Sequence, residues 1–303
     1  MSARLKDGKM KHSIHTAKVK LNNGLLMPIV GLGTHKIQGK ELIYSVLDAA
    51  LAAGYRSIDT ASVYKNESDI GSSLLELLAK YNLKREDIFI TSKLGPRDQG
   101  SGKCREACLQ SLSRLKTDYL DLYLIHWPGV QGFKPADSKQ KILRQESWKD
   151  MEMLYKEGKL KSIGISNYQK HHLEELLQDS SVKPAVLQTE HHPHLVQHEV
   201  WKFCQENNIQ YQAYSSLGAS KDNMLLNDAV IKEIGKKHQR PVAQILLRWA
   251  IQQGIGVLPK STNMQHISEN ADIFSFELDD EEMKMISQID SQHHYCWDSS
   301  TIV

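Results

Sequence analysis

The feature that most constrains the fold of this chain is a regular alternation of short apolar runs with segments of helical spacing. The apolar runs span residues 29–33, 56–59, 87–93, 121–126, 161–166, 185–188, 209–214 and 254–260. Between them, apolar residues recur on one helix face, as in residues 39–54 with Leu42, Val46, Leu47, Ala50 and Leu51. Strands that alternate with helices indicate a parallel sheet, because parallel strands need a crossover connection.

Eight strand–helix units within 303 residues favour an α/β fold of the closed (β/α)8 TIM-barrel type. No linker rich in Pro, Gly or Ser divides these units into two domains. The alternative is an open doubly wound sheet, whose usual marker is a GxGxxG turn. Here Gly31 and Gly33 are followed by Thr-His-Lys at residues 34–36, so the third glycine is missing.

Both ends of the chain add to the predicted barrel. Residues 18–34 contain Asn-Asn-Gly between two strand-like runs, which predicts an N-terminal β-hairpin. Residues 278–290 predict an additional C-terminal helix, with Asp279 or Asp280 as its N-cap. We expect residues 1–16 to form a disordered basic tail and residues 17–303 to form a single domain.

Charge and composition exclude several classes of partner. The formal net charge of +2 creates no strong field for nucleic acid or an anionic membrane surface. No window approaches the ~18 apolar residues of a membrane helix, and the first residues lack the apolar core of a signal peptide. Four cysteines are too few for a disulfide framework in a chain of this length, which favours a reducing, cytoplasmic location.

Three successive apolar runs end on ionisable side chains: Asp59, Lys93 and His126, with Tyr64 in the loop after the first. Active sites of such barrels lie at the C-terminal ends of the strands, so these side chains are expected to meet. A buried lysine beside a tyrosine lowers the pKa of the phenol from about 10, and an aspartate keeps the lysine charged. A neighbouring histidine can orient a carbonyl oxygen.

This set of side chains suits a tyrosine that protonates a carbonyl oxygen while another reagent attacks the carbon. A hydride is the reagent that no side chain can supply, so a nicotinamide cofactor is implied. No Ser-His-Asp or Cys-His combination stands at equivalent positions.

Seven stretches in a fixed order resemble the signatures of the aldo-keto reductases. They are SIDTASVYKNE (57–67), ITSK (90–93), LYLIHWP (122–128), LKSIGISNY (160–168), VLQTEHHP (186–193), YQAYSSLG (211–218) and VLPKSTNMQHISEN (257–270). The resemblance covers about residues 17–298. It implies reduction of aldehydes or ketones by NADPH, with Tyr64 as the acid and base and Asp59, Lys93 and His126 as its partners.

The same resemblance implies a cofactor site for NADPH or NADP+ without a Rossmann fold. The nicotinamide carboxamide would contact Ser166, Asn167 and Gln188, and its ring would stack on Tyr214. Gly33 and Thr34 would add the first strand's contribution, and Ser215, Leu217 and Gly218 would follow the pyrophosphate. The adenosine 2′-phosphate would meet Lys260, Ser261, Thr262 and His266, and the adenine would lie near Glu269 and Asn270.

Departures from the family pattern concern the substrate pocket and the phosphate site. His35 and Gly95 replace common tryptophans, whereas Trp127 is kept, so His35 and Trp127 are the predicted substrate contacts. Together with a short tail after residue 290, they favour small or polar carbonyls such as dicarbonyls, keto esters and short or aromatic aldehydes. His266 stands where an arginine usually completes the 2′-phosphate site.

Two alternative functions remain at this point. One is a cofactor-sensing regulatory subunit on the same fold, like the potassium-channel β subunits, although no long N-terminal inactivation segment is visible. The other is a metal hydrolase, because Glu190, His192 and His194 could share one face of an extended segment. The resemblance explains His192-Pro193 without a metal, so no metal site is predicted. We further expect a monomer, and solvated side chains for the pairs 171–172 and 293–294.

Overall fold

The computed structural model describes residues 13–218 and 223–303. Of the tail expected over residues 1–16, residues 1–12 lie outside the described residues. Residues 13–16 form a turn, in which the backbone N–H of Thr16 donates to the Ser13 carbonyl at 3.0 Å. Ile14 in this turn is buried, so packed structure begins before the predicted boundary at residue 17.

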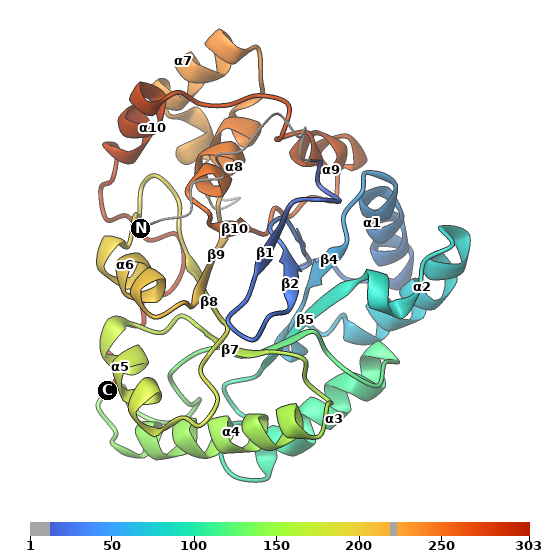
Figure 1. Cartoon of the computed structure of the whole chain (residues 1–303), viewed down its shortest axis with the longest axis vertical. Coiled ribbons are helices and arrows are strands. Elements are labelled where there is room, and N and C mark those ends of the chain that lie inside the picture. Colours follow the sequence, from blue (N-terminus) through green and yellow to red (C-terminus); the bar gives the residue numbers. More distant parts are fainter. Residues whose placement is uncertain (1–12, 219–222) are drawn as a thin grey trace.

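The described chain contains one sheet of eight parallel strands in sequence order (Figure 1). The strands are β3 (Leu32–Gly33), β4 (Ser57–Asp59), β5 (Phe89–Leu94), β6 (Leu122–Ile125), β7 (Ile163–Ser166), β8 (Val186–Glu190), β9 (Gln210–Tyr214) and β10 (Gly256–Val257). Each matches one of the apolar runs of the sequence. All of their side chains are buried except those of Gln210 and Tyr214, as expected for a parallel sheet covered on both faces.

The first and last strands meet, and this contact closes the barrel. Val30 forms a parallel bridge with Val257, whose backbone N–H donates to the Ile29 carbonyl at 2.8 Å. A Cβ atom on Gly33 would lie 2.8 Å from the Leu258 carbonyl oxygen, so only glycine permits this approach. The predicted (β/α)8 class is confirmed.

Helices surround the sheet in Figure 1. They are α1 (Lys40–Ala52), α2 (Glu67–Lys80), α3 (Lys103–Leu115), α4 (Lys139–Lys156), α5 (Lys170–Asp179), α6 (His198–Glu206), α7 (Ala229–His238), α8 (Val242–Gln252), α9 (Met264–Ala271) and α10 (Asp280–Ser287). On α1, Val46, Leu47, Ala50 and Leu51 are buried as predicted. Leu42 is 39% exposed and Ile43 takes its place in the core.

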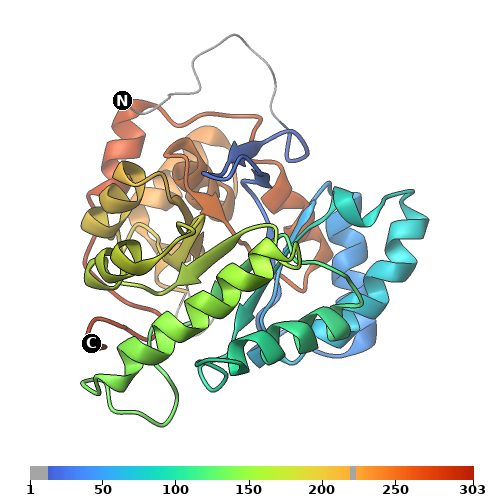
Figure 2. The same ribbon diagram turned by 60° about the horizontal axis from the view of Figure 1, so that its bottom comes forward.

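The N-terminal hairpin covers the end of the barrel where the strands begin (Figures 1 and 2). It pairs β1 (Lys18–Lys20) with β2 (Leu26–Pro28). Its buried Met27 belongs to a small apolar cluster with Phe89 and Leu122, the first residues of β5 and β6. The opposite end, where the strands finish, is therefore the open end.

The predicted C-terminal helix is α10, and Asp279 is its N-cap. The Glu282 N–H donates to the Asp279 carboxylate, and the Asp279 N–H donates to the Glu282 carboxylate, each at 2.8 Å. This reciprocal pair is a capping box, which explains why the helix begins there and not one residue later. None of the described helices is long and apolar enough to cross a membrane.

Candidate active site at the strand ends

The four predicted catalytic side chains meet at the open end of the barrel. Asp59 is the last residue of β4, Lys93 lies near the end of β5, and His126 follows β6 directly. Tyr64 ends the short 3-10 helix Ser62–Tyr64 that follows β4. Adjacent parallel strands in register bring these ends side by side, as the sequence predicted.

Lys93 is the centre of this tetrad. Its side chain is fully buried, and Nζ lies 2.5 Å from Asp59 Oδ1. Nζ also donates to the Thr60 carbonyl at 2.9 Å and lies 3.4 Å from the Tyr64 phenol oxygen. A buried ammonium is tolerated only with such partners, because desolvation of an unpaired charge is costly.

Asn66 fixes the loop that presents Tyr64, and sequence reasoning missed it. Its side chain is fully buried and accepts from the Thr60 hydroxyl at 2.6 Å. Its amide donates to the carbonyls of Thr34 and Ile37, each at 3.0 Å. One amide thus joins the loop after β3 to the loop after β4, which restricts where Tyr64 can lie.

The electrostatics of the tetrad correct one expectation from the sequence. Burial raises the pKa of Tyr64 above its ordinary value, and the Lys93 ammonium only opposes this effect. The expected lowering of the phenol pKa by lysine is therefore outweighed by desolvation. Burial lowers the pKa of Lys93. Interactions with Asp59 and Tyr64 together raise it by more, so its pKa lies above the ordinary value. Lys93 stays charged and Tyr64 keeps its proton at neutral pH.

His126 is a neutral partner of Tyr64. Burial first, and then the charge of Lys93, hold the pKa of His126 well below its ordinary value. Its ring lies edge-on to the Tyr64 ring, with centroids 5.6 Å apart. A neutral imidazole has one N–H donor and one acceptor nitrogen, so it can donate to a carbonyl oxygen beside Tyr64.

Aromatic side chains from distant segments border the tetrad. The predicted substrate contact His35 packs on Tyr64 with ring centroids 4.8 Å apart, and the other, Trp127, follows His126. The ring centroids of Trp297 and Trp127 lie 4.8 Å apart. Trp297 supplies an aromatic wall that sequence reasoning missed. Its side chain is 54% exposed, so it stands at the mouth of the site.

Most residues assigned to the nicotinamide meet beside the tetrad. The Gln188 amide donates to Asp59 Oδ2 at 2.8 Å and to Gln212 at 2.9 Å. The Tyr214 hydroxyl donates to Asn167 Oδ1 at 2.6 Å. The Asn167 amide donates to the buried Ser166 hydroxyl at 3.1 Å. The position of Gln212 gave no signal in the sequence, because it reads as an ordinary strand residue.

The other predicted cofactor residues divide into buried and exposed groups. Thr34 is buried, and its hydroxyl donates to the Asp59 carbonyl at 2.8 Å, so it supports the tetrad directly. Ser215, Leu217 and Gly218 follow β9 and are partly exposed, and Ser215 Oγ lies 3.4 Å from Cys296 Sγ. The structure does not describe residues 219–222, which follow them.

The residues assigned to the adenosine phosphate flank the start of α9. Lys260, Thr262 and His266 have exposed side chains, and Ser261 is half-buried. The helix is capped by Asn263, whose side chain accepts from the Gln265 and His266 N–H groups. Glu269 is partly buried and Asn270 is buried on the same helix. Exposed cationic and hydroxyl donors beside a helix start suit a phosphate.

The histidine-rich segment 190–194 has structural partners. The Glu190 carboxylate lies 3.0 Å from His192 Nε2 and accepts from the backbone N–H groups of Tyr295 and Cys296 at 2.7 and 3.2 Å. The described residues contain no group of three side chains arranged to bind a metal. Glu190 therefore anchors the segment that carries Trp297.

The pair of histidines at 171–172 was predicted to be solvated, and this was wrong for His172. Its ring is fully buried, and both ring nitrogens have partners within the protein. Nδ1 accepts from the Gln169 N–H, and Nε2 lies 3.0 Å from the Ile302 carbonyl oxygen. His294 is exposed and His293 half-buried. The error arose because burial by the distant residue Ile302 leaves no local pattern.

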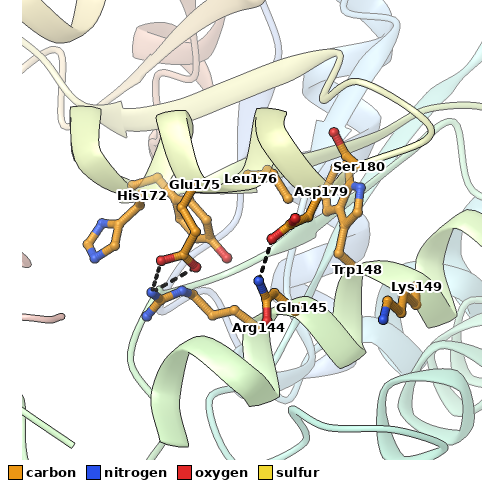
Figure 3. A pocket seen from close by; sticks show the side chains of 10 residues that line it. Arg144, Gln145, Trp148, Lys149, His172, Glu175, Leu176, Asp179 and Ser180 are labelled. Carbon is orange, nitrogen blue, oxygen red and sulfur yellow. Dashed lines mark hydrogen bonds and ion pairs between the residues drawn. The ribbon is translucent and has the colours of Figure 1, made fainter. Parts of the chain in front are cut away.

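A separate cavity of about 310 Å³ lies on the outside of the barrel, between α4 and α5 (Figure 3). Arg144, Trp148 and Glu175 are among its lining residues. No member of the tetrad lines it, so it does not belong to the chemistry described above.

Comparison with known proteins agrees with this geometry. A model of the aldo/keto reductase family matches residues 29–291. Glyoxal reductase of Bacillus subtilis (strain 168) is 46% identical over 272 residues, which are 89% of this chain and 92% of that protein.

Two solved structures extend the likeness to three dimensions. An aldo-keto reductase from a Medee basin deep-sea metagenome library matches with a TM-score of 0.85 and 40% identity, covering 93% of this chain and 98% of that one. A Bombyx mori aldo-keto reductase in complex with NADP matches with a TM-score of 0.85 and 34% identity, covering 92% and 94%. With its tetrad assembled at the strand ends, the chain belongs to the aldo/keto reductase family.

Proposed function

We propose that this protein reduces small, polar aldehydes or ketones to alcohols with NADPH, and that Tyr64 is the general acid. The observation that carries the proposal is the buried Lys93, which contacts both Asp59 and Tyr64. The likeness to a glyoxal reductase and to a structure in complex with NADP supports the same reaction class.

The residues present fit such a cofactor. Asn167, Gln188 and Tyr214 are grouped beside the tetrad at the ends of neighbouring strands, where a nicotinamide amide and ring would find polar and aromatic partners. Lys260 and His266 offer exposed donors to a phosphate near the start of α9. When bound there, NADPH supplies the hydride that no side chain can provide.

The tetrad manages the proton of the reaction. Tyr64 keeps its proton at neutral pH because burial raises the pKa of the phenol, so it can donate to the carbonyl oxygen. The phenolate that remains would be stabilised by Lys93 Nζ at 3.4 Å. The Asp59 carboxylate balances the positive charge of Lys93. The neutral His126 imidazole can donate to the same carbonyl oxygen.

The walls of the site favour small substrates with polar groups. The imidazole of His35 packs on Tyr64 where the family pattern has a larger tryptophan, whereas Trp127 and Trp297 pack together next to His126. We propose dicarbonyls, keto esters and short or aromatic aldehydes as substrates, and poor activity with steroid ketones.

A substrate panel tests this function. NADPH oxidation would be followed optically with glyoxal-type dicarbonyls, keto esters, aromatic aldehydes and a steroid ketone. We expect kcat/KM to be highest for the first three classes. A steroid ketone that exceeds them all would refute the substrate class. Tight NADPH binding without turnover of any carbonyl would favour a cofactor-sensing subunit instead.

We also propose a monomer in the cytoplasm. Cys104, Cys108 and Cys204 are free and buried, and Cys296 is free and partly buried, which suits a reducing compartment. Size-exclusion chromatography with light scattering would test the monomer.

A further inference from the structure

The last residues of the chain lie against the nicotinamide side of the site. We propose that Ser299 is a positioning residue, which orients the nicotinamide end of the cofactor by fixing the backbone of Asn167, and that Ile302 and Val303 secure Ser299 in place. This inference rests on the proposed function, because it concerns the cofactor that the function requires.

Asn167 is restrained on three sides. Its backbone is left-handed, with φ of 62°, a conformation that few non-glycine residues adopt without support. Its side-chain amide donates to the His126 carbonyl at 2.9 Å, and its Oδ1 accepts from the Tyr214 hydroxyl at 2.6 Å. The backbone carbonyl accepts from the Ser299 hydroxyl, also at 2.6 Å.

Ser299 is the contact that connects Asn167 to the C-terminal segment. Its side chain is 3% exposed, and Gln169 Nε2 donates to its hydroxyl oxygen at 3.2 Å. Since the Asn167 side chain touches both His126 and Tyr214, a shift of its backbone would move the nicotinamide partners relative to the tetrad. The hydroxyl of Ser299 is therefore placed to fix geometry and not to bind a ligand itself.

Ile302 is seated in a socket that keeps Ser299 in position. Its side chain is 4% exposed and packs against Gly129, where an added Cβ atom would lie 3.1 Å from Ile302 Cδ1. Its carbonyl oxygen accepts from Nε2 of both His171 and His172 at 3.0 Å. Because His172 Nδ1 accepts from the Gln169 N–H, its proton is on Nε2, which is the tautomer that this contact requires.

Arg144 provides the second part of this attachment. Its Nη1 donates to the Val303 oxygen at 2.7 Å and to the Pro128 carbonyl at 3.2 Å. Figure 3 shows the Glu175 carboxylate facing its guanidinium, and Nη2 lies 3.2 Å from Glu175 Oε1. Residues from α4, α5 and the loop after β6 thus hold a peptide that reaches Asn167.

Ser299→Ala tests the proposal, with Ser300→Ala as the matched control. Ser300 is exposed, and its hydroxyl donates to the neighbouring Asp298 carboxylate. Dissociation constants for NADPH and for 2′,5′-ADP, which lacks the nicotinamide, would be measured by calorimetry with thermal stability in parallel. We expect Ser299→Ala to weaken NADPH about fivefold to tenfold, the size of one lost buried hydrogen bond, and to leave 2′,5′-ADP unchanged. Ser300→Ala should change neither constant.

Two outcomes would overturn the positioning role. One is an NADPH constant for Ser299→Ala equal to that of the wild type. The other is equal weakening of NADPH and 2′,5′-ADP, which would indicate general loosening of the protein. If wild type binds NADPH but reduces no carbonyl substrate, the proposed function fails, whereas a selective loss of NADPH affinity in Ser299→Ala would still support the positioning role.

Ile302→Ala provides a second route if Ser299→Ala folds poorly. It leaves every polar contact of Asn167 in place and removes only the side chain that seats the peptide. We expect the same selective weakening of NADPH, about twofold to threefold. An unchanged ratio of the NADPH and 2′,5′-ADP constants in this variant would contradict the securing role of Ile302.

Discussion

Two lysines at opposite ends of the proposed cofactor site are built in opposite ways. Lys93 is fully buried and has its three partners, Asp59, the Thr60 carbonyl and Tyr64, in place within the protein. Lys260 is exposed and makes no ion pair with any residue that the structure describes. The first lysine is preorganised, whereas the second must lose side-chain freedom when it meets a phosphate.

The contrast implies different roles for the two lysines: the buried one serves the chemical step, and the exposed one serves cofactor affinity. A buried charge network resists reorganisation and fixes the proton donor, but removing one member leaves the others desolvated and unpaired. An exposed cation contributes binding free energy and little to folding. Substitutions at the two ends should therefore differ in kind and not only in size.

The largest effects are expected within the tetrad. Tyr64→Phe removes the proton donor and should lower kcat/KM by about 10³-fold, within the range for general acids. Lys93→Met should lower it at least as much and should also cost about 3–5 kcal/mol of unfolding free energy, because the Asp59 carboxylate stays buried without its cation. NADPH oxidation and chemical denaturation would measure both.

Tyr64→Phe is the control for stability in this pair of variants, because it removes the proton donor and keeps the buried ion pair. Tyr64→Phe should unfold at nearly the wild-type denaturant concentration and bind NADPH normally. Turnover by Tyr64→Phe close to that of wild type would remove the proton-donor role. Wild-type stability in Lys93→Met would mean that the buried pair is not the structural unit described above.

The same contrast between buried and exposed groups explains which site residues could be predicted from the sequence. Asp59, Lys93 and His126 were predictable because each ends an apolar run, and a parallel barrel must bring such ends together. Asn66 and Trp297 were not predictable, since their roles depend on side-chain contacts between loops that no periodicity records. The direction of the Tyr64 pKa was missed for a related reason: the extent of burial is set by the folded packing.

The next effect concerns the phosphate end. Lys260→Ala should raise the dissociation constant of NADPH about tenfold, roughly one charge-assisted hydrogen bond, and barely change that of NADH. Its kcat and thermal stability should stay near wild type, since the side chain is exposed. Lys284, an exposed lysine on α10, gives a matched control in Lys284→Ala, which should bind both cofactors normally. Equal weakening of NADPH and NADH by Lys260→Ala would place this lysine elsewhere on the cofactor.

A smaller effect distinguishes His266 from the arginine that it replaces. A guanidinium is always charged and presents a planar fork to phosphate, whereas an imidazole offers at most two N–H donors. His266→Arg should therefore tighten NADPH a few-fold with little change for NADH. Fluorescence titrations of both cofactors decide it, and equal tightening of NADPH and NADH by His266→Arg would leave this position without a role at the phosphate.

The smallest expected change is in the pH dependence of the chemistry itself. Burial raises the pKa of Tyr64, so the phenol remains protonated as the pH rises through 9, and reduction is lost only at more alkaline pH. Burial and Lys93 lower the pKa of His126, so the imidazole remains neutral as the pH falls to 6. With NADPH saturating, kcat should accordingly vary less than about twofold between pH 6 and pH 9. Buffers of constant ionic strength are needed, because exposed charges at the phosphate end are screened by salt. A sigmoidal loss of kcat centred near pH 7, with NADPH still saturating, would show that a tetrad group titrates there and that the buried end is less insulated from solvent than its contacts indicate.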